Sequence, residues 1–412
     1  MSFRSLRTGV TGLKSNQTRL DVVGNNISNA NTVAFKRGRA AFSEVLGQKL
    51  LGVGRTAGGS GINPSHVGLG VSVGSIDQNW EQGSLENTGI QTDLALNGDG
   101  FFIASPKEGA SSDQRMLTRA GNFTFNQNGE FVTANGLNVQ GWEFQNGQVQ
   151  TGELKNVQFD PNAQSPAKFT SEATVGGNLS ADAAVGDTSS VSSVVYDEQG
   201  QAHDVVIDFE KTADNEWEYT IDAADPTNSP FTGAATGTLQ FDTSGAITSG
   251  GTTSIAWDAG AVAGGPNMDL DLTGITQFAG STTSKFESQN GNSAGELSGY
   301  SINPEGVLEL NFTNGEQKEL FQLAVGNVNN PNGLEQQGEN FYTTTGASGD
   351  LQLGRAGRDL RTAVVAGTLE ASNVDLATEF SEMIVAQRGY QAAARVVTTS
   401  DEVLQETVQL KR

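Results

Sequence analysis

Close to its end the sequence contains the run LATEFSEMIVAQRGYQAAARVVTTSDEVLQETV, which spans Leu376 to Val408. Its apolar residues recur with alternating spacings of four and three, a period of 3.5 residues that is typical of a coiled-coil seam. Gln387 and Asp401 are the polar exceptions. No proline interrupts the run, so we predict a helix from about residue 370 to 411, roughly 60 Å long. The large side chains of this seam are Leu376, Phe380, Met383, Tyr390, Val397, Leu404 and Val408.

The other end of the chain carries the same pattern. Apolar side chains and two exceptions, Gln17 and Gly24, follow the same alternation of four and three. A narrow apolar stripe favours contacts between helices, within one chain or between chains. Packing of each helix on the protein's own β core is the alternative. The apolar members of this second seam are Leu6, Val10, Leu13, Leu20 and Ile27.

Between its two ends the sequence is typical of antiparallel β structure. Glycine is abundant, with 52 residues, and proline is scarce, with 9, a balance that favours tight turns. The pairs Asn128-Gly129 and Asn314-Gly315 adjoin strand-like runs and predict hairpins with type I′ turns. Alternation of Trp217, Tyr219 and Ile221 with polar residues predicts a half-buried strand. We therefore expect a mixed, mostly β fold with a helix at each end.

Charge is distributed unevenly along the chain, whose net charge is −23. Residues 1–55 carry nine Lys or Arg and two Asp or Glu, residues 56–350 carry eight and thirty-seven, and residues 351–412 carry seven and eight. The middle is an acidic body, which argues against nucleic acid as the main partner. The short basic cluster from Phe35 to Arg39 is more typical of a solvated loop or of contact with an acidic neighbouring subunit.

Several kinds of chemistry have no support in the sequence. Cysteine is absent, which excludes disulfides, thiolate metal sites and a cysteine nucleophile. The two histidines lie far apart, and no motif of a serine hydrolase, a nucleotide-binding loop or a zinc protease occurs. The stretch Asn97 to Gly100 lacks the spacing of a calcium loop and predicts a tight turn. We expect no catalytic site, no metal and no cofactor.

The sequence also lacks the segments that direct a protein into or across a membrane by the Sec route. No apolar run approaches the roughly 20 residues of a membrane span. Arg4 and Arg7 are not followed by the apolar region of a signal peptide. We expect no membrane insertion, and export by another route if the protein leaves the cytoplasm.

Two longer motifs resemble the flagellar axial family of rod and hook proteins. The first runs from Leu20 to Thr32 and continues at Phe35-Lys36, and the second runs from Leu369 to Leu376 and continues into Met383 to Gln391. Ala34 stands where the family commonly has Gly. The residues that carry the two signatures are Asn25, Asn26, Ile27, Asn29, Phe35, Lys36, Ser372, Asn373, Val374, Asp375, Gln387, Arg388 and Tyr390.

The middle of the chain narrows the choice within this family. The stretch Val195 to Asp204 resembles the outer β-domain of hook proteins, which the shorter rod proteins lack. The resemblance implies two nested antiparallel β-domains, the outer one an insertion, with terminal helices that form a coiled-coil-like assembly domain. The implied boundaries are 1–30 plus 366–412 for the assembly domain, 31–70 for an extended linker region, 71–155 plus 289–365 for the inner β-domain and 156–288 for the outer β-domain.

The resemblance implies a structural function without catalysis. A hook subunit polymerises head-to-tail into a flexible tube, a universal joint that transmits torque from rod to filament. The implied partners are further copies of the chain, the distal rod, the hook cap, the hook–filament junction proteins and the flagellar export apparatus. The implied location is the extracellular hook, reached without a Sec signal peptide. The two apolar seams are the expected subunit contacts.

Three other interpretations stay open at this point. A distal-rod protein would share the terminal signatures but lack the insertion at about 156–288. An extracellular β-rich enzyme with helical ends, such as a carbohydrate hydrolase, would require a clustered carboxylate site in a cleft. An adhesin or filament-capping protein would share the helical ends but not both signatures.

Overall fold

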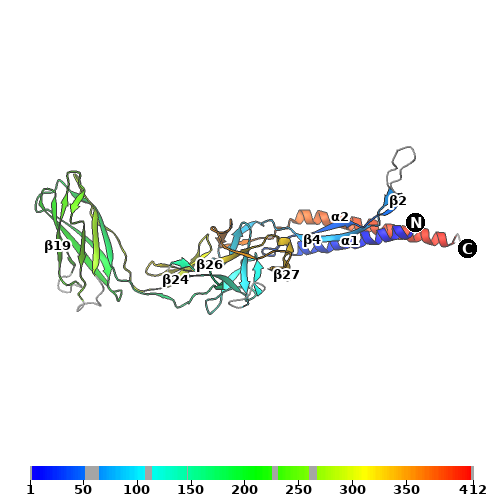
Figure 1. The fold of residues 1–412 in the computed structure, drawn as a ribbon, viewed down its shortest axis with the longest axis horizontal. Helices are drawn as coiled ribbons and strands as arrows, with labels where there is room; N and C mark the ends of the chain where they lie inside the picture. Colours follow the sequence, from blue (N-terminus) through cyan, green and yellow to red (C-terminus); the bar gives the residue numbers. More distant parts are fainter. Residues whose placement is uncertain are drawn as a thin grey trace. The chain divides into compact units, whose positions relative to one another are not determined.

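The computed structural model describes residues 2–51, 65–106, 114–145, 147–224, 231–258 and 267–409. The chain divides into two compact units. The inner unit comprises Met1–Asp160, Ser301–Glu309 and Glu319–Arg412, and the outer unit comprises Pro161–Tyr300 and Leu310–Lys318. In chain order the outer unit is therefore an insertion into the inner one, with the helices at the two ends of the sequence (Figure 1).

Both predicted helices are confirmed. Helix α1 spans Ser2–Ser28 and helix α2 spans Leu376–Gln409. Helix α2 starts at an N-cap, because the Asp375 carboxylate accepts hydrogen bonds from the Thr378 hydroxyl at 2.7 Å and from the Ala377 N–H at 2.9 Å. The hydrogen bond from Thr378 and those from the backbone stabilise the charged carboxylate and lower the pKa of Asp375.

The β part of the inner unit is a set of short antiparallel strands around an apolar core. Phe102, Ile103 and Leu117 are completely buried in it. The strands are β1 (Gly38–Glu44), β2 (Gln48–Leu51), β3 (Ser65–Val67), β4 (Val71–Gln78), β5 (Leu85–Asn87), β6 (Leu94–Asn97), β7 (Phe101–Ser105), β8 (Met116–Thr118), β9 (Phe123–Phe125), β10 (Phe131–Thr133), β11 (Asn138–Gln145), β12 (Gln148–Val149), β13 (Lys155–Asn156), β27 (Glu335–Gly338), β28 (Phe341–Thr343), β29 (Gln352–Arg355), β30 (Ala363–Ala366) and β31 (Thr368–Glu370), with a 3₁₀ turn at Pro331–Gly333.

The pairing of these strands brings the two ends of the chain together. Strand β5 pairs with β31 and β6 with β30, so early and late segments share their hydrogen bonds. The central path runs β11-β7-β8-β28-β27. Strands β1 and β4 form a separate antiparallel ribbon that contacts α1. The helices and the strands beneath them are therefore one packed body, within the same unit.

The outer unit contains two sheets whose buried side chains form one core. One sheet has the order β16-β17-β18-β19-β20 and the other the order β21-β22-β15-β23. The strands are β14 (Gln164–Ser165), β15 (Glu172–Ser180), β16 (Thr188–Tyr196), β17 (Ala202–Ala213), β18 (Glu216–Ala223), β19 (Ala235–Phe241), β20 (Ile247–Ser249), β21 (Thr252–Ile255), β22 (Met268–Phe278) and β23 (Lys285–Gln289). Strands β24 (Gly295–Ile302), β25 (Val307–Phe312) and β26 (Gln317–Asn327) each continue from one unit into the other.

The alternation predicted for the outer strands is confirmed. Trp217, Tyr219 and Ile221 of β18 are buried, and Phe209 on the neighbouring strand β17 lies opposite Tyr219. Such facing apolar pairs stabilise antiparallel strands. One pairing departs from the expected antiparallel order, because β15 and β22 are parallel.

The predicted hairpins form, but the predicted turn type is wrong. Gly129 and Gly315 have φ values of 76° and 82°, whereas Asn128 and Asn314 are not among the residues with positive φ. The Gly129 N–H donates to the Asn126 carbonyl at 3.0 Å. A type I′ turn needs two residues with positive φ, so these are type I turns followed by a left-handed glycine.

Candidate functional site: the terminal helix pair and its junction

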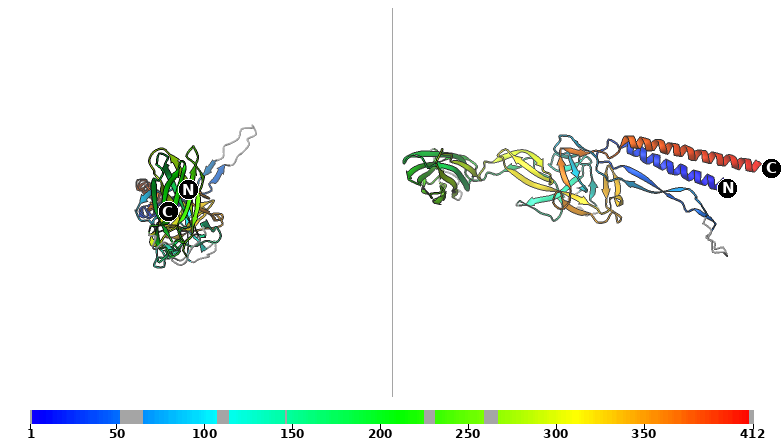
Figure 2. Two further views of the ribbon diagram at one scale, coloured as in Figure 1. Left: turned by 90° about the vertical axis from the view of Figure 1, so that its left-hand side faces the viewer. Right: turned by 90° about the horizontal axis from the view of Figure 1, so that it is seen from above.

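The two terminal helices lie side by side and antiparallel (Figures 1 and 2). Near the chain ends the Ser400 hydroxyl donates to Ser5 Oγ at 3.1 Å. Near the other end the Asn26 amide donates to Glu379 Oε2 at 3.1 Å, and the Arg19 guanidinium lies 3.5 Å from Glu382 Oε2. The prediction that the two ends of the chain meet is confirmed.

The helices approach closely because small residues lie between them. A Cβ on Gly9 would lie 2.8 Å from Val397 Cγ2, and one on Gly389 would lie 2.5 Å from Asn16 Oδ1. Ala386 is completely buried. We call this line of inward-facing residues the contact seam: Ser5, Gly9, Gly12, Asn16, Arg19, Val23 and Asn26 on α1, and Glu379, Glu382, Ala386, Gly389, Ala393, Val397 and Ser400 on α2.

The contact seam is not the apolar seam that the sequence suggested. On both helices it runs one residue before the apolar seam, for example at Gly9 rather than Val10 and at Glu379 rather than Phe380. Val397 belongs to both. One residue turns a helix by about 100°, so the two seams occupy neighbouring faces. The contacts within the chain therefore use one face of each helix and leave much of the apolar face uncovered.

The predicted assembly residues divide into two groups by exposure. The half-buried members along the edges of the contact seam are Leu6, Leu13, Leu20, Ile27, Met383 and Leu404, and Val397 is half-buried within that seam. The exposed members are Val10 (48% exposed), Leu376 (43%), Phe380 (50%), Tyr390 (40%) and Val408 (67%). Further apolar side chains that the seam analysis did not single out are exposed on α2: Ile384, Val385, Val396 and Val403.

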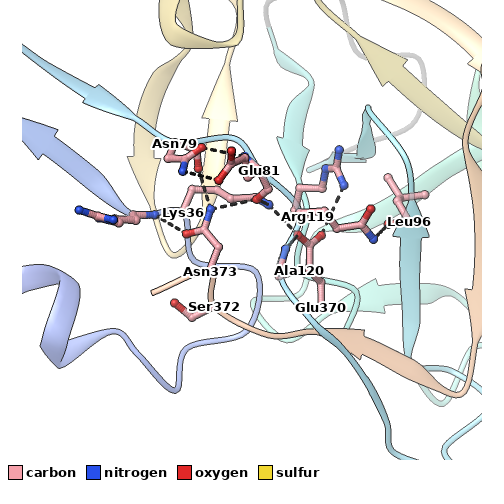
Figure 3. A network of polar contacts seen from close by, with 12 residues as sticks. Lys36, Asn79, Glu81, Leu96, Arg119, Ala120, Glu370, Ser372 and Asn373 are labelled. Carbon is pink, nitrogen blue, oxygen red and sulfur yellow. Dashed lines mark hydrogen bonds and ion pairs between the residues drawn. The ribbon is translucent and has the colours of Figure 1, made fainter. Parts of the chain in front are cut away.

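Next to the helix pair, a buried cluster of ion pairs between Lys36, Arg119 and Glu370 joins several segments of the chain (Figure 3). Glu370 is completely buried, and its Oε1 lies 2.6 Å from the Lys36 ammonium and accepts the Gly83 N–H at 2.9 Å. Its Oε2 lies 3.4 Å from the Arg119 guanidinium. The cluster thus fastens three distant parts of the sequence, because Lys36 follows α1, Glu370 ends β31 and Arg119 follows β8.

Burial and pairing act in opposite directions on the two cations. Desolvation lowers the pKa of Lys36 and the attraction of Glu370 opposes that shift. Burial likewise lowers the pKa of Arg119 and Glu370 opposes it. Arg119 also lies over the Phe101 ring, 5.6 Å from its centroid. The carboxylate of Glu370 therefore compensates two charges that would otherwise be costly to bury.

Two asparagines of the signatures satisfy backbone groups around this cluster. The Asn373 amide donates to the carbonyls of Asn79 and Glu81 at 2.8 and 2.9 Å, and its oxygen accepts the Arg37 N–H at 2.8 Å. Asn26 bonds both the N–H and the carbonyl of Gly38. Both asparagines therefore serve as backbone connectors, a role that needs an amide with a donor and an acceptor.

Other signature residues have varied places. Phe35 is buried, and its carbonyl accepts the Asn373 N–H at 3.3 Å. Asn29 donates to the Asn25 carbonyl one turn earlier at 2.9 Å. The remaining members lie on or near α2 or α1: Ser372, Val374 and Ile27 are half-buried, whereas Asp375, Gln387, Arg388 and Tyr390 are exposed. Most signature residues therefore lie where the helices meet the β part, whereas Gln387, Arg388 and Tyr390 at the end of the second signature are exposed.

Sequence reasoning did not assign the acidic partners in this junction. Glu370 lies inside the second signature and Arg37 inside the basic cluster, but neither had a partner assigned, and no role was assigned to Arg119 or Glu379. Arg37 lies 2.6 Å from Glu379 Oε1 and 3.2 Å from Glu382 Oε1. The only signal in the sequence for a buried ion pair was the position of Lys36 directly after Phe35, a residue type that is usually buried. The partner of Lys36 lies 334 positions away in the sequence, a distance that no local pattern spans.

Replacement of Ala34 by glycine should stabilise the folded protein. It is 1% exposed and has a φ of 57°, in the left-handed region where a Cβ costs roughly 1–2 kcal/mol. Ala34→Gly should therefore raise the free energy of unfolding by up to about 1 kcal/mol in denaturant titrations. Ala95→Gly, at a completely buried strand position, is the control and should lower it. Equal losses in both variants would contradict the strain at Ala34.

The described residues contain no group of three or more His, Cys, Asp or Glu placed to hold a metal ion. None of the helices described is long and apolar enough to cross a membrane. What the geometry provides is a buried, ion-paired junction and, next to it, a helix pair with exposed apolar side chains.

Family models match most of the chain. The model described as flagella basal body rod protein matches residues 6–36, and the model for the flagellar basal body rod FlgEFG protein C-terminal matches residues 365–410. The flagellar hook protein FlgE/F/G D1 domain matches residues 95–175, and the flagellar basal body protein FlaE D2 domain matches residues 171–292.

Two relatives match the chain over nearly its whole length. The chain is 35% identical to the flagellar hook protein FlgE of Treponema pallidum over 100% of both chains. It is 35% identical to the FlgE protein of Salmonella typhimurium, over 99% of this chain and 100% of that one. The crystal structure of the Helicobacter pylori flagellar hook protein FlgE2 shares the fold, with a TM-score of 0.54 at 13% identity, and covers 69% of this chain and 100% of that chain.

The match extends over the whole length of proteins that are structural parts of the flagellum, so the chain belongs to the flagellar hook protein family and is a structural subunit of the bacterial flagellar hook.

Proposed function

We propose that the chain polymerises head-to-tail through the apolar seams of its terminal helices. The observation that carries this proposal is the offset of the two seams. The contact seam joins the helices within one chain, and the apolar seam beside it leaves Phe380 and Tyr390 half exposed. A line of exposed apolar side chains is costly in water and marks an interaction surface.

The proposed assembly domain is the helical part, residues 1–30 plus 366–412, which adjoins the buried junction of Lys36, Arg119 and Glu370. The junction fixes where the helices leave the β part, because its charges compensate one another only in this geometry. The other proposed parts are the linker 31–70, the inner β-domain (71–155 plus 289–365) and the outer β-domain (156–288). A contact between different surfaces of successive copies does not close and produces a helical tube.

The polymer that we propose is a flexible tube that transmits torque from rod to filament. Its other partners would be the distal rod, the hook cap, the hook–filament junction proteins and the flagellar export apparatus. The extracellular hook is the proposed site of action, and no catalytic step belongs to it.

Polymerisation of the purified full-length chain tests this function. In a kosmotropic salt, which strengthens apolar burial, the chain should sediment as polymer above a critical concentration. Electron microscopy should show hollow, curved tubes. Straight rods would support a rod subunit instead. A chain that stays monomeric at every concentration, with both helices intact by circular dichroism, would contradict self-assembly.

A further inference from the structure

A groove opens on the helix pair near the two chain ends. It has a volume of about 950 Å³ and lies between the start of α1, the last turns of α2 and the end of β3. Val67, Val396 and Val403 line it and are 38%, 45% and 50% exposed. Arg4 and Arg395 line it as well. The groove thus combines an apolar floor with two cations.

The end of α2 carries the complementary charge. From Val396 to Gln409 the helix has three acidic residues, Asp401, Glu402 and Glu406, and no Lys or Arg. Val408 in the same segment is 67% exposed. Since Ser400 lies opposite Ser5 and α1 begins at Ser2, the last turns of α2 extend past the start of α1. We call the side chains of Asp401, Glu402, Glu406 and Val408 the acidic tip, none of which lines the groove.

Among the described residues, no ion pair joins Arg4, Arg395, Glu402 or Glu406 to another side chain. Arg395 and Glu402 are seven residues apart, two helical turns, so they lie on one face of α2. Along this face cations come first and carboxylates follow. Lys411 and Arg412 come after the tip in the sequence and lie outside the described residues.

This order of charges favours a neighbour that is shifted along the helix axis. Two parallel copies in register would place Arg395 against Arg395 and Glu402 against Glu402. A shift of seven residues, about 10 Å, places the carboxylates of one copy against the cations of the next. Rim charges of this kind select register and partner more than they add affinity.

We propose that the groove receives the acidic tip of a second copy of this chain, with Glu402 and Glu406 of that copy against Arg4 and Arg395. Val408 of the tip lies on the apolar floor of the groove. The groove and the tip are different surfaces, so the contact continues from copy to copy and staggers the subunits instead of closing a flat ring. This inference rests on the proposed self-assembly and specifies its register.

A charge exchange between two variants tests the contact. The groove variant carries Arg4→Glu and Arg395→Glu, and the tip variant carries Glu402→Lys and Glu406→Lys. When either variant is present alone, every contact between a groove and a tip brings like charges together. The critical concentration for polymerisation of that variant should therefore rise about tenfold or more at physiological salt. An equimolar mixture restores opposite charges at every contact and should polymerise near the wild-type concentration. Helicity measured by circular dichroism should be unchanged in both variants.

The control is Lys14→Glu with Lys318→Glu, which changes the net charge as much as the groove variant does but lies outside the groove. It should polymerise within about threefold of wild type. The proposed contact is overturned if either variant alone polymerises like wild type or if the control is impaired as much as the variants. It is also overturned if the equimolar mixture does not polymerise or forms dimers only. If the wild-type chain itself does not polymerise, the proposed function has failed and not this contact alone.

Discussion

Replacement of Glu370 by alanine should lower the free energy of unfolding of the inner unit by about 3–5 kcal/mol. Glu370 compensates two buried cations, since the side chain of Lys36 is 1% exposed and that of Arg119 6% exposed. Removing one partner of a buried ion pair leaves a desolvated charge without compensation, and here it leaves two. The Gly83 N–H also loses its acceptor. Among the stability changes considered, this is the largest.

Hydrogen exchange with mass spectrometry measures the effect in the full-length chain. Peptides that cover β31 and the segment around Lys36 should lose protection, whereas peptides of β17 in the outer unit should keep it. The matched control is Glu143→Gln. Its partner Lys155 lies 2.6 Å away, but the two side chains are 33% and 46% exposed. That variant should change stability by less than about 1 kcal/mol. Similar small effects in both variants would show that the cluster does not hold the junction.

Aspartates at Phe380 and Tyr390 should abolish polymerisation while leaving the monomer folded. The two side chains are 50% and 40% exposed in the single chain, so a carboxylate at either position can stay in contact with water. Buried aromatic anchors contribute about 2 kcal/mol or more each to an interface, and the double variant should raise the critical concentration roughly a thousandfold. Sedimentation at increasing concentration measures this directly.

The control places the same charges elsewhere on α2. Ser381 and Ala392 are exposed, and the rotation of about 100° per residue puts them on a different face from Phe380. Ser381→Asp with Ala392→Asp should leave the critical concentration within about tenfold of wild type. If the two double variants lose assembly equally, the apolar seam is not the distinguishing surface.

The sequence predicted the elements of this protein better than their contacts. The helices at both ends, the β-rich middle and the hairpins at Asn128-Gly129 and Asn314-Gly315 follow from local periodicity and turn chemistry, and the structure contains them. Local patterns do not decide which face of a helix packs against its partner within the chain. The apolar seam was the stronger periodic signal, yet within the chain the helices meet along Gly9, Ala386 and their neighbours, where small side chains permit close approach.

Other features lay beyond a sequence-based analysis for a similar reason. The parallel pairing of β15 with β22 joins strands nearly a hundred residues apart. The ion cluster joins Lys36 to Glu370 across an even longer separation. In both cases the partner is chosen by the packing of the whole unit. The family resemblance identified Lys36 as a signature residue, but only the geometry shows that it forms a buried ion pair with Glu370.

The most direct test of the account uses the absence of cysteine from the natural chain. Phe380→Cys and Tyr390→Cys provide single thiols in the apolar seam, and Ala386→Cys provides one in the contact seam. A water-soluble thiol reagent should label the first two rapidly in the monomer and at least tenfold more slowly in assembled tubes, because other subunits cover them. The thiol at position 386 should be protected in both states. If positions 380 and 390 stay as reactive in tubes as in monomers, the apolar seam is not the assembly surface.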